Sequence, residues 1–139
     1  MSAQNLPINM LASFVEELSI NAPFLNKDEG KSVSQEVSMS TGINFKYFNK
    51  SKNIHKITMV IDITQKDFPD FKAHIKICGL YLIEQNLSKE EAQKYISTSG
   101  LQSLYGMARE IIVSSIKNTS YIPIILPLVD FSIDKLHID

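Results

Sequence analysis

The sequence has few of the residues from which redox, metal and phosphate sites are built. It contains one cysteine, Cys78, which excludes an intramolecular disulfide and a cysteine cluster for zinc. Its five glycines are isolated, so a glycine-rich phosphate loop is absent. His55, His74 and His137 are far apart, and none is spaced from a carboxylate as a metal site or a catalytic triad requires. The sequence therefore predicts a protein that is not an enzyme and has no cofactor and no metal.

Long hydrophobic runs and concentrated charge of one sign are also lacking. The longest apolar stretch, IPIILPLV at 122–129, is too short to cross a bilayer. The first residues, MSAQNLPINMLASFVEELS, lack the basic region and long apolar run of a signal peptide. The formal net charge is -1 and the lysines are scattered, whereas nucleic-acid binding needs a concentrated basic surface. We therefore expect a cytoplasmic protein with neither a membrane nor a nucleic acid as partner.

What is present is the composition of one globular domain. The chain has 139 residues, of which 44% are hydrophobic and 21% charged, enough to bury a core. Neither an internal repeat nor a low-complexity tract interrupts it. The sequence predicts a single domain over residues 1–139.

The first half of the chain has the pattern of β-strands. Apolar and polar residues alternate over 33–47, 57–63 and 71–77, as in strands with one face on a core. Residues 11–21 fit either a strand or a helix, and the Ala22-Pro23 pair that follows favours the strand. The short connections indicate antiparallel neighbours.

The second half has the pattern of helices. Ser88 and Glu91 are spaced as a capping box at the start of a helical region, and STSG at 97–100 is expected to break or bend it. A main helix is predicted over 101–117. Strands followed by helices predict an α+β fold, with helices on one face of an antiparallel sheet.

The helix at 101–117 carries more apolar surface than one sheet can cover. At ~100° per residue its apolar side chains spread over roughly 240°, whereas a surface helix needs only ≳100°. Either the chain's own segment YIPIILPLV covers the second side, or another copy of the chain does. We favour the second copy, because homo-oligomers bury such stripes isologously. The predicted oligomer contacts are Leu104, Met107, Ala108, Ile111 and Ile112.

Four motifs in order resemble the SecB family of export chaperones. LSINAP at 18–23 resembles the family's first strand and the turn after it, and CGLYLIE at 78–84 resembles the end of its fourth strand. LYGMAREII at 104–112 and YIPIILPLVDF at 121–131 resemble its long helix and the proline-flanked segment that follows. The resemblance extends over roughly residues 14 to 132.

The resemblance implies both a fold and a function. It implies a four-stranded antiparallel sheet with the long helix packed on one face, and a tetramer built as a dimer of dimers. Family members are not enzymes and bind no cofactor. They act as holdases: unfolded or partly folded polypeptides lie in long apolar grooves and are kept from folding. In many bacteria these clients are handed to the translocation ATPase SecA.

The positions that match the family's acidic SecA contacts differ in this sequence. They carry Glu17, Asn21, Lys72 and His74, so only Glu17 remains a possible SecA contact. This difference counts against delivery to SecA. The alternative function is therefore a dedicated SecB-like interaction module, or an antitoxin-type chaperone, that binds one specific client without SecA.

A holdase needs exposed apolar surface with polar residues around it. For several candidates, core packing or subunit contact is an equal alternative: Phe24, Tyr81, Ile124 and Leu126. Nucleic-acid binding on the sheet is disfavoured, because the aromatic residues Phe45 and Tyr47 are predicted to lie on the core face. The predicted client-binding residues are Phe24, Leu25, Phe48, Tyr81, Leu82, Tyr121, Ile124 and Leu126.

Overall fold

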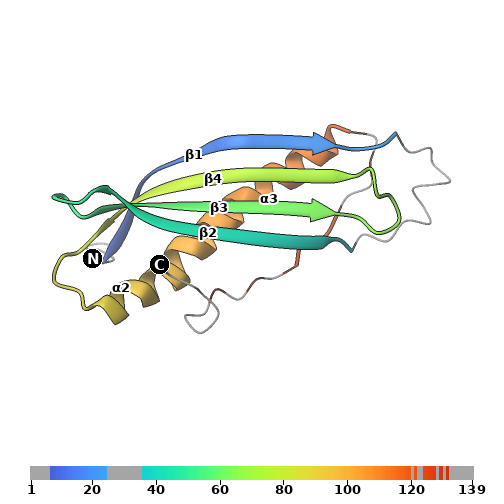
Figure 1. Cartoon of the computed structure of the whole chain (residues 1–139). Coiled ribbons are helices and arrows are strands. Elements are labelled where there is room, and N and C mark those ends of the chain that lie inside the picture. Colours follow the sequence, from blue (N-terminus) through green and yellow to red (C-terminus); the bar gives the residue numbers. More distant parts are fainter. Residues whose placement is uncertain are drawn as a thin grey trace, which may run out of the picture.

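A computed structural model of the chain has one antiparallel sheet and one long helix that crosses a face of it (Figure 1). It describes residues 7–24, 36–119, 121, 124–127, 129 and 131. The predicted fold class is confirmed, including four strands and a helix in the C-terminal half. The strands are β1 (Ile8–Asn21), β2 (Ser38–Asn49), β3 (Ile54–Thr64) and β4 (Lys72–Ile83).

The strands lie in the order β1-β4-β3-β2, and all neighbours are antiparallel. Strands β2, β3 and β4 follow one another as a meander, whereas β1 pairs with β4. The two strands that are adjacent in sequence, β1 and β2, therefore form opposite edges of the sheet. The register of β1 shifts twice, between Met10 and Ala12 and between Val15 and Glu17.

The helices are α2 (Lys89–Tyr95) and α3 (Leu101–Lys117), joined by a π-helical turn, η1 (Ile96–Gly100). The Ser88 hydroxyl accepts the Glu91 backbone N–H at 3.1 Å, so the predicted helix start is confirmed. The expected break or bend at 97–100 takes the form of the π turn. There the Ser97 and Thr98 hydroxyls donate to the Lys94 carbonyl, competing with the regular helical hydrogen bonds.

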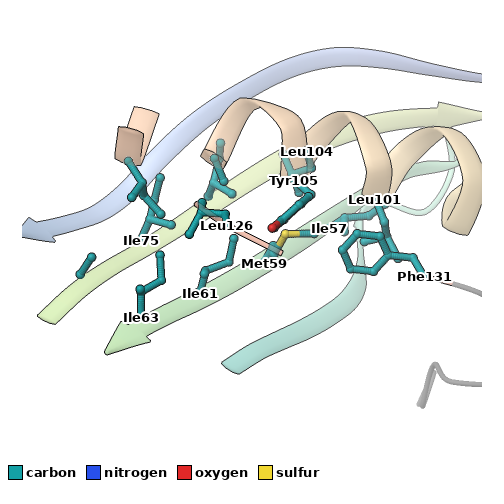
Figure 2. Packing of buried hydrophobic residues seen from close by; sticks show 14 of the residues in the cluster. Ile57, Met59, Ile61, Ile63, Ile75, Leu101, Leu104, Tyr105, Leu126 and Phe131 are labelled. Carbon is teal, nitrogen blue, oxygen red and sulfur yellow. The ribbon is translucent and has the colours of Figure 1, made fainter. Parts of the chain in front are cut away.

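The core lies between the sheet and α3 (Figure 2). Alternate residues of β3 and β4 face the helix because side chains in a strand repeat every second position. The helix supplies the stripe that meets them. The fully buried members of β3, β4 and α3 include Ile57, Met59, Ile61, Ile63, Ile75, Ile77, Leu101, Leu104, Ala108, Ile112 and Ile116.

The chain's own C-terminal segment covers one flank of α3. Tyr105 donates its hydroxyl to the Pro127 carbonyl at 2.6 Å, and the Gln102 side chain donates to the Val129 carbonyl at 3.2 Å. Ile125 also forms a parallel bridge with Glu36, ahead of β2. The segment thus lies between α3 and the β2 side of the sheet, and our preference for another copy as the cover is wrong for this flank.

Candidate functional site

Three of the predicted client-binding residues are available to a partner. Phe24, beyond the end of β1, is 81% exposed, and Phe48, near the end of β2, is 62% exposed. Leu82 is 38% exposed on the sheet face opposite the helix. Leu25 lies outside the described residues.

Four other predicted client-binding residues are buried in the core, and this corrects their assignment: Tyr81, Tyr121, Ile124 and Leu126. Tyr81 points to the helix side of β4 and donates its hydroxyl to the Gly100 carbonyl at 2.9 Å. The Tyr121 ring stacks on Phe71, with centroids 4.4 Å apart. The extended segment at 124–127 turns alternate side chains inward, so Ile124 and Leu126 pack against the chain itself while Ile125 stays exposed.

The predicted oligomer contacts also divide into two groups. Leu104, Ala108 and Ile112 are fully buried within the chain, so their assignment to a contact with another copy is corrected. They occupy the centre of the apolar stripe, and the centre faces the sheet. Met107 and Ile111, at the edge of the stripe, are half-buried and remain accessible.

Met107 and Ile111 line a cavity of ≈ 670 Å³ between α3 and the edge strand β1, with Val15 on its opposite wall. We call it the β1–α3 groove. Strand β1 also exposes four large apolar side chains, none of which the sequence prediction assigned to a binding surface. The signal was present in LASFVEELSI, where apolar residues fall on both parities, as the two register shifts of β1 require. These exposed residues are Leu11, Phe14, Val15 and Leu18.

A second cavity, of ≈ 690 Å³, lies between the β2–β3 hairpin and α2, and we call it the hairpin–α2 groove. Its wall on the sheet consists of Phe45, Tyr47 and His55, and the helical side includes Ala92 and Ile96. Phe45 and Tyr47 face the helix side as predicted. Among the described residues, the short helix α2 is what lies opposite them at this end, and Tyr47 stays exposed. The sequence prediction placed no site here.

Aromatic rings form much of the sheet side of this groove. The Tyr47 and His55 rings lie 4.5 Å apart, and His55 Nε2 is 3.1 Å from Asn53 Oδ1. Burial lowers the pKa of His55, which keeps the ring neutral. Lys50 Nζ lies 5.7 Å from the centre of the Tyr47 ring, at the rim. Such a groove suits apolar or aromatic side chains.

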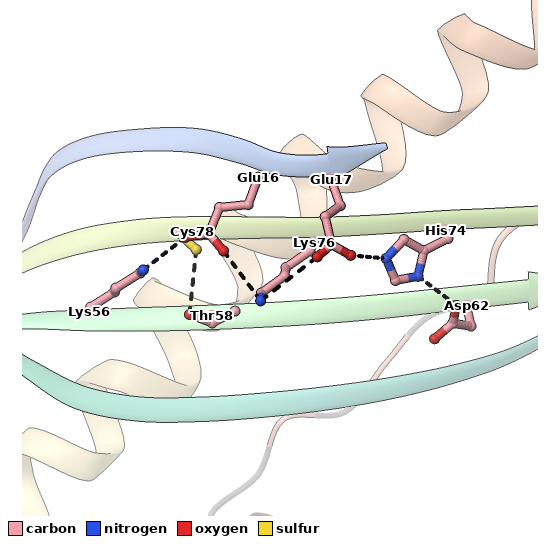
Figure 3. Close-up of polar contacts among 8 residues, drawn as sticks. All are labelled: Glu16, Glu17, Lys56, Thr58, Asp62, His74, Lys76 and Cys78. Carbon is pink, nitrogen blue, oxygen red and sulfur yellow. Dashed lines mark hydrogen bonds and ion pairs between the residues drawn. The ribbon is translucent and has the colours of Figure 1, made fainter. Parts of the chain in front are cut away.

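The sheet face opposite the helix carries a network of charges that we call the outer-face ladder (Figure 3). Glu16 pairs with Lys56 at 2.8 Å and with Lys76 at 3.4 Å. Glu17 pairs with Lys76 at 3.9 Å and with His74 at 2.8 Å, and His74 reaches Asp62 at 2.7 Å. Its members are Glu16, Glu17, Lys56, Asp62, His74 and Lys76.

The ladder neutralises its own acidic groups. The hydrogen bond from Lys56 lowers the pKa of Glu16 to about 2, so this carboxylate stays charged and paired. Glu17, the predicted SecA contact, already contacts two basic side chains, His74 and Lys76. Beneath the ladder Cys78 lies 3.4 Å from the Thr58 hydroxyl, and burial raises the pKa of its thiol, as in an unreactive structural cysteine.

Within the described residues, no three His, Cys, Asp or Glu side chains converge as a metal site would require. None of the helices in that part of the chain is both long and apolar enough to span a membrane.

The sheet and helix form a SecB-like fold. The SecB-like chaperone Rv1957 of Mycobacterium tuberculosis, solved in complex with a ChAD peptide from the HigA1 antitoxin, superposes with a TM-score of 0.67. The match covers 88% of this chain and 87% of that one, at 11% identity. The chain belongs to the SecB family, because the family model "Preprotein translocase subunit SecB" matches residues 1–135.

Two relatives named protein-export protein SecB agree with this assignment. The Wolbachia protein from the strain wRi is 28% identical, over 85% of this chain and 81% of its own. The protein of Novosphingobium aromaticivorans is 25% identical, over 90% of this chain and 72% of its own. Membership in this family supports a chaperone role in protein export. It also supports the prediction of a protein without enzymatic activity.

Proposed function

We propose that the chain is a holdase that binds unfolded or partly folded polypeptides and keeps them from folding or aggregating. The observation that carries this proposal is the hairpin–α2 groove, an open aromatic and apolar surface that the described part of the chain leaves unfilled. Phe48, on the hairpin that bounds the groove, adds exposed apolar surface. Charged residues such as Lys46, Glu84 and Lys89 line its margin, which keeps such a surface soluble.

The C-terminal segment of the chain illustrates how an extended peptide packs on this fold. In it Ile124 and Leu126 are buried against the core, while Ile125 between them is 60% exposed. A client in the same extended form would place every second side chain in a groove and leave the others in water. Contacts of this kind tolerate varied sequences, provided that apolar residues recur at the right spacing.

We also propose that copies of the chain assemble, as a dimer of dimers, and that the contact includes the β1–α3 groove. The groove combines half-buried side chains of α3 with exposed apolar side chains of an edge strand, and an edge strand has unpaired backbone groups. A second copy of the chain that docked here would bury the apolar side chains and pair the backbone groups at the same time, and this supports the proposed contact. This contact differs from the predicted one, because its centre is the edge of the helix stripe and β1.

A dedicated module that binds one client without SecA is the second candidate. The observation that favours it is the outer-face ladder, where Glu17 and Asp62 are paired with basic side chains and are not free to attract a partner. An acidic contact surface for SecA is therefore weaker on this chain than the family resemblance implies.

Light scattering from aggregating proteins distinguishes the two candidates. Several unrelated proteins are unfolded and diluted, with and without stoichiometric amounts of the chaperone. A general holdase delays the aggregation of most of them, whereas a dedicated module protects none or one. If no protein is protected at a several-fold molar excess, the general holdase function is rejected.

A further inference from the structure

His74 lies on the inner strand β4, between carboxylates from its two neighbouring strands, β1 and β3 (Figure 3). Its Nδ1 is 2.7 Å from Asp62 Oδ1 of β3, and its Nε2 is 2.8 Å from Glu17 Oε1 of β1. A carboxylate only accepts hydrogen bonds, and a neutral imidazole has only one N–H to donate. Both contacts are satisfied together only when the ring is protonated.

The other charged groups around His74 do not cancel the preference of its ring for the protonated form. On β4 itself, Lys72 and Lys76 lie two positions away on the same face, and Lys76 is 3.9 Å from the second oxygen of Glu17. Strand β2 places Ser40 opposite Asp62, and α3 packs on the other face of the sheet. The hydrogen bonds to Asp62 and then to Glu17 raise the pKa of His74 above its usual value.

Glu17 belongs to β1, one of the two edge strands of the sheet. Residues 11–19 of β1 are all exposed, and the strand has a neighbour on one side only, β4. The ion pairs of β1 on the outer face join Glu16 to Lys56 and Lys76, and Glu17 to Lys76 and His74. The pair with His74 lies next to the register shift between Val15 and Glu17, where the backbone ladder is irregular.

We propose that His74 is a pH-sensitive clamp: the protonated ring ties Glu17 of the edge strand β1 to Asp62 of β3, and loss of the proton loosens the second half of β1. This device is additional to the chaperone function and does not rest on it. Because the folded pKa is raised, the clamp's contribution to stability is complete below pH 6.5 and is lost as the pH rises through the folded pKa. The strand so released is the one that carries Val15 and Leu18.

NMR titration of His74 and amide exchange in β1 test the clamp. We expect His74 to titrate above pH 6.5, and the protection factors of residues 15–21 to fall as the pH rises through the pKa of His74 in the folded chain. The protection factors should fall about tenfold for each unit by which the contact with Glu17 raises the pKa of His74. Glu17→Gln should remove this pH dependence, while His74 still titrates above pH 6.5 because Asp62 remains. His55→Gln, in the hairpin–α2 groove, should leave the pH dependence intact.

Two results would overturn the proposal. One is a His74 that titrates at or below pH 6.5 in the unaltered chain, a measurement that needs no variant. The other is the same pH dependence of β1 exchange in the unaltered chain and in Glu17→Gln, since the second half of β1 would then respond to some other group.

Discussion

At the scale of the residue, three buried tyrosines differ in what their hydroxyls do. Tyr81 and Tyr105 donate to the carbonyls of Gly100 and Pro127, respectively. The Tyr121 hydroxyl is buried and has no hydrogen-bond partner among the described residues. Burial raises the pKa of all three, that of Tyr121 to about 12, so each hydroxyl stays neutral. Their contributions to stability should therefore differ.

Replacing Tyr105 and Tyr121 by Phe tests this difference. Tyr105→Phe removes the link between α3 and the C-terminal segment, and we expect it to lower the free energy of unfolding by about 1 kcal/mol. Tyr121→Phe keeps the ring that stacks on Phe71 and removes a hydroxyl that lacks a partner, so stability should be unchanged or higher. Urea unfolding of both variants provides the measurement. An equal loss in the two would contradict this account of Tyr121.

At the scale of the element, the sequence predicts the helices and strands in which apolar residues recur with a clear period. The helix at 101–117 agrees with α3 at both ends, and the alternation over 57–63 falls inside β3. The period does not say which strand becomes an edge. That depends on the pairing of β1 with β4, a contact between distant parts of the chain. Ile124 and Leu126 show the same limit: their alternation indicates an extended segment, but not whether it packs on its own core or on a client.

The fourth strand contains a close approach between a glycine and an aromatic ring. A methyl group on Gly79 would lie 2.5 Å from the Tyr81 ring, whereas one on Gly42 of β2 would meet nothing within 4 Å. We expect Gly79→Ala to displace Tyr81 and destabilise the fold by about 1–3 kcal/mol. Gly42→Ala is the matched control and should be neutral or slightly stabilising. Thermal unfolding measures both, and equal melting temperatures for the two variants would contradict the packing described for Tyr81.

At the scale of the whole molecule, α3 is covered by the sheet and, along one flank, by the chain's own C-terminal segment. The breadth of the apolar stripe predicted a second cover, but not that the chain would supply part of it. In the part of the chain that the structure describes, α3 remains open toward β1, at the β1–α3 groove. The hairpin–α2 groove could not be predicted from the sequence. Its two walls are far apart along the chain, and only folding brings them together.

Neighbouring isoleucines of α3 separate assembly from folding. Ile111 is half-buried at the β1–α3 groove, whereas Ile112 is fully buried in the core. Ile111→Asp should lower the native mass and leave the fold intact. Ile112→Asp should instead cost about 3–5 kcal/mol of stability, since it places an unpaired charge in the core. Light-scattering mass and circular dichroism provide the two measurements. If Ile111→Asp folds and keeps the native mass of the unaltered chain, this groove is not the contact.

The most direct test of the chaperone account is a comparison of two variants in the aggregation measurement. Ala92→Glu places a charge in the wall of the hairpin–α2 groove, and Ser103→Glu makes the same change of charge on the exposed side of α3. Both variants should fold. The account predicts that Ser103→Glu delays client aggregation as well as the unaltered chain does, and that Ala92→Glu loses most of this effect. Full protection by a folded Ala92→Glu variant would contradict the claim that clients bind in this groove.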